Sequence, residues 1–370
     1  MNELNPPARL LLGPGPSNAP YRVLRAMSTP VIGHLDPKFM EIMDDVCELL
    51  RQTFRTKNQM TFPVSGTGSA GMETAFVNLL EPGDTAVIGV NGVFGTRMCD
   101  VAKRCGAKVV KVEAEWGQII EPGRMLDAVR ENPGAKLCAI VHAETSTGVL
   151  QPIQELGDFL KNKETLFLVD SVTSLGGVQL EVDDWGVDAC YSGTQKCLCV
   201  PPGLAPVSFS PKAMEVIANR KSKVQSWYLD VTMLQNYWAA GDTQRLYHHT
   251  APISMIYGLR EGLRIIQEEG IESRWERHAA ATGHLYKGLE EMGFSLWAQE
   301  GYRLPPLTSA LLPQGWDVDG IRKQLLLDYD IEVGGGLGAV AGKIWRIGLM
   351  GENACVQKVA VLLRALQDFA

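Results

Sequence analysis

An acid and a lysine stand at the ends of two apolar segments in the middle of the chain. Asp170 closes the apolar run 166–169, and Lys196 follows a second short run at 189–192. A lysine amine forms Schiff bases with aldehydes, and a carboxylate can hold a pyridine nitrogen in its protonated state. A buried strand that ends in an acid, beside a short strand that leads to a lysine, therefore predicts a site for pyridoxal 5′-phosphate. We expect Lys196 and Asp170 to be its catalytic residues.

A glycine-rich loop lies between an expected strand and an expected helix. It carries the pattern Gly-x-Gly-x-x-Gly from Gly66 to Gly71. Because free backbone N–H groups at a helix start bind phosphate, we expect Gly68 and Ser69 to anchor a phosphate group. The same pattern occurs in dinucleotide-binding proteins, so a nicotinamide-dependent oxidoreductase is a remote alternative. That alternative needs an acid after the next strand, where this chain has Asn91.

Two further side chains suit the ring of such a cofactor. Phe94 lies between two glycines after an apolar run, and its ring offers a flat surface on which a pyridine can stack. Packing in the core is the alternative role for Phe94. Thr145 belongs to the polar cluster 142–148 at another strand end, and its hydroxyl can donate to a phenolic oxygen. The alternative for Thr145 is a capped loop.

Candidate contacts to substrate and phosphate follow later in the chain. Arg346 lies in an otherwise apolar segment and needs an anion there. A substrate carboxylate offers a bidentate match, and a protein acid is the alternative partner. Tyr247 and Thr250 can donate hydroxyls to phosphate. The two histidines between them have no accompanying acid or cysteine cluster, so we expect no metal site.

Strand-like and helix-like segments alternate through most of the chain. The expected strands are 60–64, 85–90, 108–112, 137–142, 165–170, 189–192, 205–208, 308–312, 331–333 and 344–347, and the expected helices are 71–80, 95–105, 123–131, 152–162, 254–270, 271–292 and 357–369. Apolar strands alternating with helices predict a mostly parallel sheet with both faces covered, which binds ligands beyond the carboxyl ends of its strands. The pattern after about residue 250 indicates a smaller α+β domain.

The composition excludes several classes of function. The chain has 370 residues, of which 45% are hydrophobic and 21% are charged, and its net charge is −7, so we expect no nucleic-acid partner. Its eight cysteines form no Cys-x-x-Cys pair, which argues for a reducing compartment. No apolar run reaches the ~20 residues of a membrane span, and the first residues lack a signal-peptide pattern. We therefore expect a cytoplasmic protein without a membrane partner.

Taken together, these segments resemble the fold-type I, class V pyridoxal-phosphate aminotransferases. The similarity covers nearly the whole chain, and the combination of motifs is specific although no single motif is. The motifs are Leu12-Gly-Pro-Gly-Pro-Ser17, Ser65-Gly-Thr-Gly68, His142-Ala-Glu-Thr-Ser-Thr-Gly148, Val169-Asp-Ser-Val172 with Gly176-Gly177, Gly193-Thr-Gln-Lys196, Tyr247-His-His-Thr250 and Trp345-Arg-Ile-Gly348. The resemblance implies an α/β fold with an N-terminal arm at a dimer interface (1–20), a large, mostly parallel sheet domain that binds the cofactor (21–255) and a smaller C-terminal α+β domain (256–370).

The resemblance also implies a role for each matched residue. Lys196 would form the Schiff base, and Asp170 would pair with the pyridinium nitrogen. Arg346 would bind the substrate carboxylate, with Gly15 and His34 also on the substrate side. The other cofactor contacts would be Thr67, Gly68, Ser69 and Gln195 at the phosphate, Phe94 and Val172 at the ring, Thr145, and Tyr247 and Thr250 reaching in from the second subunit of a homodimer. Phe94 departs from the tryptophan that is frequent at its position.

Within the family, the chain resembles the alanine–glyoxylate and serine–pyruvate branch. The implied reaction moves an amino group from L-alanine or L-serine to glyoxylate or pyruvate, with ping-pong kinetics through Lys196. Ureidoglycine–glyoxylate aminotransferases are an alternative, but they carry glutamine in place of His34 and asparagine in place of Tyr247. Serine–glyoxylate transfer is another, because a pocket that does not pair the serine hydroxyl discriminates weakly against alanine. Gln195 argues against cysteine desulfurases, which place histidine before the lysine.

Overall fold

Seven strands form the large sheet in the computed structural model, which describes residues 3–239 and 245–369. Their order is β2 (Met60–Ser65), β10 (Leu204–Phe209), β9 (Ala189–Tyr191), β8 (Leu166–Asp170), β5 (Leu137–Val141), β3 (Thr85–Val90) and β4 (Lys108–Glu113). Strand β10 runs antiparallel to both of its neighbours, and the other pairs in the sheet are parallel. The expected mostly parallel α/β sheet is confirmed.

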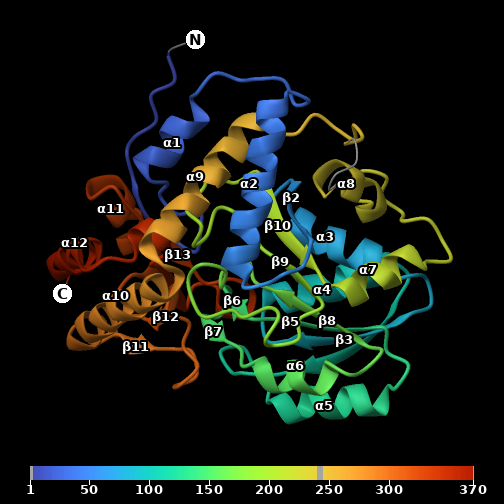
Figure 1. Cartoon of the computed structure of the whole chain (residues 1–370). Helices are drawn as coiled ribbons and strands as arrows, with labels where there is room; N and C mark the ends of the chain where they lie inside the picture. The colour runs from blue at the N-terminus through green and yellow to red at the C-terminus, as the bar shows by residue number, and fades with distance from the viewer. Residues whose placement is uncertain (1–2, 240–244, 370) are drawn as a thin grey trace.

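Helices enclose this sheet because most of its strands are apolar along their whole length and buried (Figure 1). The helices are α1 (Tyr21–Met27), α2 (Pro37–Phe54), α3 (Gly68–Leu79), α4 (Val93–Arg104), α5 (Pro122–Glu131), α6 (Gln154–Leu160), α7 (Pro211–Ala218), α8 (Val231–Trp238) and α9 (Ile253–Glu269). Four of them, α1, α2, α7 and α8, were not among the expected helices. Helix α2 begins at Asp36-Pro37, whose carboxylate caps the helix by accepting from the Lys38 N–H.

A second, five-stranded sheet carries the C-terminal part of the chain. Its order is β1 (Leu10–Leu12), β13 (Ile331–Gly335), β14 (Ile344–Gly348), β12 (Leu307–Leu311) and β11 (Ser295–Leu296). Its helices are α10 (Ile271–Glu291), α11 (Val318–Asp328) and α12 (Val356–Leu366), which gather at the left of Figure 1. This domain has a hydrophobic core of its own, with Leu285, Ile347 and Leu362 fully buried.

Two features of the packing differ from the expected division of the chain. Strand β1, in the N-terminal arm, pairs in parallel with β13 and so completes the small domain's sheet. The expected boundary at 255/256 falls inside α9, whose buried residues Ile256, Leu259 and Leu263 belong to the large core. The large core therefore includes the whole buried face of α9, and Ile271 at the start of α10 belongs to it as well.

The strand register brings three loops to one edge of the large sheet. Asp170, the last residue of β8, pairs with Val141 of β5 on one side and with Tyr191 of β9 on the other. The loops that follow β5, β8 and β9 therefore begin side by side. The short hairpin of β6 (Ala143–Glu144) and β7 (Val149–Leu150) belongs to the first of these loops. This edge holds the candidate site.

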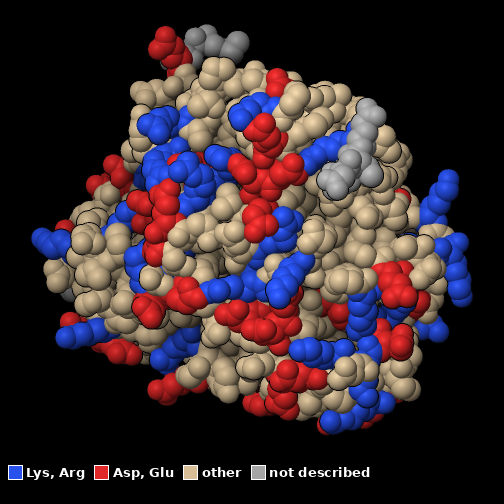
Figure 2. Space-filling model, viewed as in Figure 1, with Lys and Arg blue, Asp and Glu red and all other residues tan. Residues whose placement is uncertain are grey.

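Charges of both signs are interspersed on the face of the molecule seen in Figure 2. Many of them form surface pairs, such as Arg22 with Glu268 and Arg260 with Asp45. Among the described helices, none has both the length and the apolar character needed to cross a membrane.

Candidate active site

The carboxylate of Asp170 and the amine of Lys196 lie near each other beyond the ends of β8 and β9. Asp170 ends β8, and Lys196 lies in the loop between β9 and β10. They are 2% and 8% exposed, and the charge of each shifts the pKa of the other. The fold thus brings together the two residues whose spacing predicted the site, while their catalytic roles stay predictions.

Asp170 is held by two hydrogen bonds in a buried setting. The Val172 N–H donates to Oδ1 (2.9 Å), and the Tyr191 hydroxyl donates to Oδ2 (2.8 Å). Burial raises the pKa of Asp170 to about 7, and these two donors oppose that rise because they favour the charged carboxylate. Tyr191 is fully buried, and burial raises its own pKa well above the ordinary value, so it remains a donor. Tyr191 is a site residue that its sequence pattern does not indicate, because it lies within a short apolar run.

Lys196 lies in a setting that favours the neutral amine. Burial, followed by the positive charge of Arg346, lowers the pKa of Lys196 from 10.5 to about 8. Its Nζ donates to the Pro14 carbonyl. A lysine with a pKa near neutrality can take up and give back a proton at physiological pH. Lys196 is therefore suited to proton transfer as well as to bonding an aldehyde.

The N-terminal arm closes over Lys196. Gly15 has a φ of 104°, and a Cβ placed on it would lie 2.6 Å from the Lys196 Cδ, so only glycine fits at this position. The Ser17 N–H donates to the Gln195 carbonyl (2.9 Å), and the Ser17 hydroxyl donates to the Lys196 carbonyl (2.9 Å). The predicted substrate contact Gly15 thus touches the lysine side chain itself.

The glycine-rich loop and the first turn of α3 (66–71) form the cradle that is expected to hold a phosphate. Thr67 precedes α3 without making a side-chain cap, which leaves backbone N–H groups of the first turn to face outward. Gly68 packs closely on Val172, since a Cβ there would lie 3.2 Å from Val172 Cγ2. The Oε1 atom of Gln195 is buried and has no hydrogen-bond partner among the described residues. Because Oε1 is an acceptor, an anion at this position would be bound by the Nε2 donors of the amide and by the N–H groups of the helix start.

Ser69, the other predicted phosphate anchor, accepts a hydrogen bond from Arg97 Nη1 (3.2 Å). Arg97 also lies over the Phe94 ring, 5.0 Å from its centroid. A cation therefore stands between the predicted phosphate anchor and the predicted stacking residue, which adds positive charge to the cradle.

Asn91, at the position where a dinucleotide site needs an acid, is buried and donates to the Gln118 carbonyl (3.0 Å). Its side chain is thus used within the protein, which gives no support to the oxidoreductase alternative.

Glu144 is a buried carboxylate for which the sequence pattern predicts no role of its own. It accepts from the backbone N–H groups of Phe94 (3.1 Å) and Gly95 (3.4 Å) in the first turn of α4, and from the Ser146 hydroxyl (2.6 Å). Burial raises its pKa, and these donors oppose the rise. Glu144 therefore fixes Phe94 at the start of α4. Thr145, the next residue, is buried with its hydroxyl 3.3 Å from that of Thr173.

Arg346 in β14 meets main-chain oxygens and not a protein acid. Its Nε donates to the Gly335 carbonyl (2.8 Å) and its Nη1 to the Thr145 carbonyl (3.1 Å). Burial lowers its pKa to about 10, so it stays charged at neutral pH. In the described part of the chain its hydrogen bonds go to carbonyls alone, and with Gly15 it lines a cavity of about 710 Å³. Among the described residues, Arg346 therefore does not form the alternative contact, an ion pair with a protein acid.

His34, Tyr247 and Thr250 form a separate group on the surface. The rings of His34 and Tyr247 lie 5.2 Å apart, and the Tyr247 hydroxyl lies 3.5 Å from the Thr250 hydroxyl. Tyr247 is 60% exposed. Tyr247 thus contacts both His34 and Thr250, and the described hydrogen bonds and ring contacts of these residues do not include Lys196. The structure thus brings most predicted residues to one edge of the sheet and leaves these three apart.

The two histidines after Tyr247 are bonded inward. His249 Nε2 lies 2.8 Å from the Ser65 hydroxyl, and its Nδ1 lies 2.9 Å from that of His248. The His248 ring stacks on Trp227 at 4.5 Å. Among the described residues, no group of three or more His, Cys, Asp or Glu side chains is arranged to hold a metal ion.

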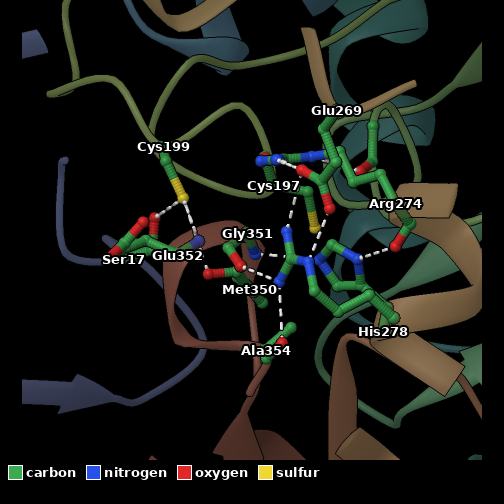
Figure 3. Close-up of polar contacts among 12 residues, drawn as sticks. Ser17, Cys197, Cys199, Glu269, Arg274, His278, Met350, Gly351, Glu352 and Ala354 are labelled. Carbon is green, nitrogen blue, oxygen red and sulfur yellow. Dashed lines mark hydrogen bonds and ion pairs between the residues drawn. The ribbon is translucent and has the colours of Figure 1, made fainter. Parts of the chain in front are cut away.

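A buried polar cluster ties the Lys196 loop to the small domain (Figure 3). Arg274 of α10 donates to the carbonyls of Gly176 (3.1 Å) and Cys197 (2.7 Å), and to Glu269 (2.6 Å). Gly351, in the loop after β14, donates its N–H to His278 Nε2 (2.8 Å). This cluster therefore holds the loop of the lysine against the loop that follows the strand of Arg346.

Cys199 extends the same cluster toward the N-terminal arm. Its Sγ accepts from the Glu352 N–H (2.9 Å) and lies 3.4 Å from the Ser17 hydroxyl. Cys199 adopts a φ of 55°, which is costly for a residue with a side chain. Contacts from the arm and from the small domain hold this strained turn in place.

Comparisons with known proteins agree with this geometry. The family model described as Aminotransferase class-V matches residues 10–339. The alanine–glyoxylate aminotransferase of Rattus norvegicus is 41% identical over 99% of this chain and 88% of its own length. The (S)-ureidoglycine–glyoxylate transaminase of Bacillus subtilis (strain 168) is 38% identical over 99% of this chain and 91% of its own length.

Among solved structures, an alanine–glyoxylate aminotransferase from Nostoc sp. is 46% identical, with a TM-score of 0.96 over 100% of this chain and 97% of that one. These relatives are transaminases, and their family implies pyridoxal phosphate as cofactor. Because the likeness spans the whole chain in both sequence and structure, the protein is a transaminase and belongs to the class-V aminotransferases.

Proposed function

We propose that the enzyme moves an amino group from L-alanine or L-serine to glyoxylate or pyruvate, with pyridoxal 5′-phosphate as cofactor. One observation carries the proposal: a buried Asp170–Lys196 pair lies near Arg346, which reaches over from β14 of the small domain and whose hydrogen bonds go to carbonyls and not to an acid. The names of the relatives, two of which act on alanine and glyoxylate, support the choice of substrates.

The residues at this edge fit the cofactor. Asp170 would accept a hydrogen bond from the protonated ring nitrogen, and Lys196 would bond the aldehyde carbon. Val172 and Phe94 would contact the two faces of the ring, and Thr145 would donate to the phenolic oxygen. The phosphate would take the N–H groups at Gly68 and Ser69, the Thr67 hydroxyl and the Gln195 amide. When bound, the cofactor supplies an electron-withdrawing ring that stabilises negative charge at the substrate Cα.

The chain's own groups then handle the substrate and the proton. Arg346 would hold the substrate carboxylate through its guanidinium, which stays charged because its pKa is about 10. Lys196 Nζ, freed by the incoming amino group, would take the Cα proton and later return it. Its pKa of about 8 allows both steps near neutral pH. The keto acid product leaves before the second keto acid enters, which gives ping-pong kinetics.

The choice of substrates rests on the residues at positions 34 and 247. Ureidoglycine–glyoxylate aminotransferases resemble this chain but carry amide side chains at both positions. Here a histidine and a tyrosine lie with their rings 5.2 Å apart, and neither offers the paired amide donors and acceptors that a ureido group would need. This contact favours the alanine–glyoxylate reaction, with ureidoglycine–glyoxylate or serine–glyoxylate transfer as the second candidate.

We also propose a homodimer in which Tyr247 and Thr250 complete the site of the partner subunit. Tyr247 is 60% exposed beside other exposed apolar side chains, Leu246 at 57% and Trp227 at 59%. Apolar side chains gathered on a surface are typical of an interface. We also propose a cytoplasmic location. It is supported by the eight cysteines, which are all free thiols.

An absorption spectrum tests the proposed reaction. We expect the purified enzyme with added pyridoxal phosphate to show a visible Schiff-base band, which L-alanine removes and glyoxylate restores. The Lys196→Ala variant should lack the band, whereas Lys287→Ala, which alters an exposed lysine, should keep it. Without a band in the wild type the cofactor proposal fails. A band that responds to another amino donor, but not to alanine or serine, would support the transamination chemistry and contradict the proposed substrates.

A further inference from the structure

A second cavity, of about 590 Å³, lies away from the candidate active site. Trp185, Tyr302 and His142 line it together with Glu155 and Asp158 of α6. None of its lining residues belongs to the cavity of Arg346. The Leu150 N–H donates to the Tyr302 carbonyl (2.8 Å), so the cavity lies where β7 meets a loop of the small domain. Its volume is within the range of small-molecule sites.

The lining of this cavity carries negative charge. Glu155 and Asp158 are exposed carboxylates, and no lysine or arginine is among the lining residues. His142 adds no positive charge, because burial lowers its pKa to about 3. A bound ligand therefore meets two carboxylates and no protein cation, which favours a cationic ligand.

Aromatic rings supply the second part of the recognition. Trp185 and Tyr302 are half-buried, and the His142 ring packs edge-on to Trp185 with centroids 5.6 Å apart. Aromatic faces beside carboxylates attract ammonium groups through their quadrupoles. His142 is 3% exposed, and its Nδ1 has no hydrogen-bond partner among the described residues. His142 thus contributes its ring to the cavity wall, while its Nδ1 is enclosed within the protein.

The cavity is joined to the catalytic strand through His142. The His142 N–H donates to the carbonyl of Asp170 (3.0 Å), and its carbonyl accepts from the Gln151 N–H (2.8 Å). His142 thus connects the main chain of Asp170 to a cavity wall.

We propose that this cavity is a binding site for a small organic cation of the quaternary ammonium type, separate from the active site. Such a ligand places its positive charge near Glu155 and Asp158 and its methyl groups against Trp185 and Tyr302. The proposal does not depend on which amino acids the enzyme uses.

Binding of choline to the holoenzyme tests this site, with 3,3-dimethylbutan-1-ol as the uncharged ligand of the same shape. Neither compound has a primary amine, so neither can react with the cofactor aldehyde. Saturation-transfer NMR titrations would be run on wild type, on Glu155→Gln/Asp158→Asn, and on Trp185→Leu. Glu290→Gln/Asp328→Asn is the matched control, since it removes two exposed acids elsewhere.

We expect choline to bind wild type and the control equally, and the uncharged alcohol to bind at least about fivefold more weakly. The Glu155→Gln/Asp158→Asn and Trp185→Leu variants should each weaken choline binding by a similar factor while their cofactor spectrum is unchanged. Equal binding of choline and the alcohol would overturn the cation recognition. Choline binding that both cavity variants leave unaffected, or no binding to wild type, would overturn the site.

Discussion

Tyr191 is the residue on which the charge of Asp170 depends. Asp170 is almost fully buried, and burial alone favours the neutral acid, which cannot stabilise a protonated ring nitrogen. The Tyr191 hydroxyl and the Val172 N–H donate to its two oxygens and lower the cost of the charge. A hydrogen bond to an ionised group contributes about 1.5–3 kcal/mol, which corresponds to about one pKa unit or more.

We therefore expect Tyr191→Phe to raise the pKa of Asp170 further above its present value of about 7. The cofactor needs the ionised carboxylate, which is lost as pH falls through that pKa, so the acid limb of the pH profile moves to higher pH. Cofactor affinity at neutral pH should fall by about tenfold. Titrating pyridoxal phosphate into the apo-enzyme between pH 6 and 9 measures both effects. Tyr228→Phe, at a tyrosine 39% exposed, is the control.

A purely structural role for Tyr191 would look different. Tyr191→Phe would then lower the melting temperature and leave the pH profile of cofactor binding unchanged. That result would contradict the assignment.

Sequence reasoning could identify Asp170 and Lys196 because charged residues at the ends of apolar runs are unusual. It could not identify Tyr191, since a tyrosine inside a short apolar run has the pattern of a core residue and its hydroxyl partner depends on strand register. The role of Glu144 could not be predicted for a related reason. It accepts from backbone N–H groups of α4, some fifty residues away in the chain. Such contacts follow from the sheet order, which local patterns do not determine.

At the scale of elements, α10 holds the Lys196 loop and the loop after β14 in position relative to each other. Arg274 bonds the carbonyl of Cys197, next to Lys196, and His278 bonds the loop after β14. The His278 Nδ1 faces the Arg274 carbonyl at 2.7 Å, so Nδ1 carries the proton and Nε2 accepts from Gly351. Both bonds lie on one face of one helix (Figure 3), which makes α10 the rigid link between the two loops.

Arg274→Lys keeps the charge but loses the planar set of donors that reaches Gly176, Cys197 and Glu269 together. We expect kcat to fall by about tenfold or more while the cofactor still binds stoichiometrically, because small displacements of a catalytic lysine are costly. Steady-state kinetics with a cofactor titration measure this split. Arg264→Lys, at a half-exposed position on α9, should leave kcat unchanged. A lower melting temperature with a normal kcat would contradict this prediction and show that Arg274 only stabilises the fold.

The regular elements that build the sheet were predictable, whereas those that join the domains were not. Strands such as β8 and β5 are continuous apolar runs, and their positions follow from composition alone. Strand β1 has three residues and exists because it pairs with β13, more than three hundred residues later. The arm carrying Gly15 is placed by that pairing, so its approach to Lys196 could not be read from local sequence.

For the whole molecule, the exposed segment at Tyr247 is the feature that one chain leaves unexplained. The Tyr247 and Thr250 hydroxyls lie 3.5 Å apart, the exposed Leu246 adjoins Tyr247, and the exposed Trp227 stacks on His248. The sequence predicts that these hydroxyls could bind phosphate, but only the family resemblance assigns them to a second subunit, because nothing local distinguishes a surface tyrosine from one that serves a partner. Residues 240–244, just before this segment, lie outside the described part of the chain. The proposed homodimer therefore requires a functional test.

Mixed dimers test whether Tyr247 and Thr250 serve the active site of their own chain or that of the partner subunit. One chain would carry Lys196→Ala, and the other would carry Tyr247→Phe with Thr250→Ala. If these hydroxyls serve the partner's site, one site of the mixed dimer collects every change and the other is wild type in all three residues. We therefore expect the isolated mixed dimer to have about half the wild-type activity, although each parent dimer has little. If the hydroxyls served their own chain's site, both sites of the mixed dimer would be damaged and activity would stay at the parents' level. Measuring kcat of purified, differently tagged mixed dimers thus decides whether an active site of this enzyme contains residues from one subunit or from two.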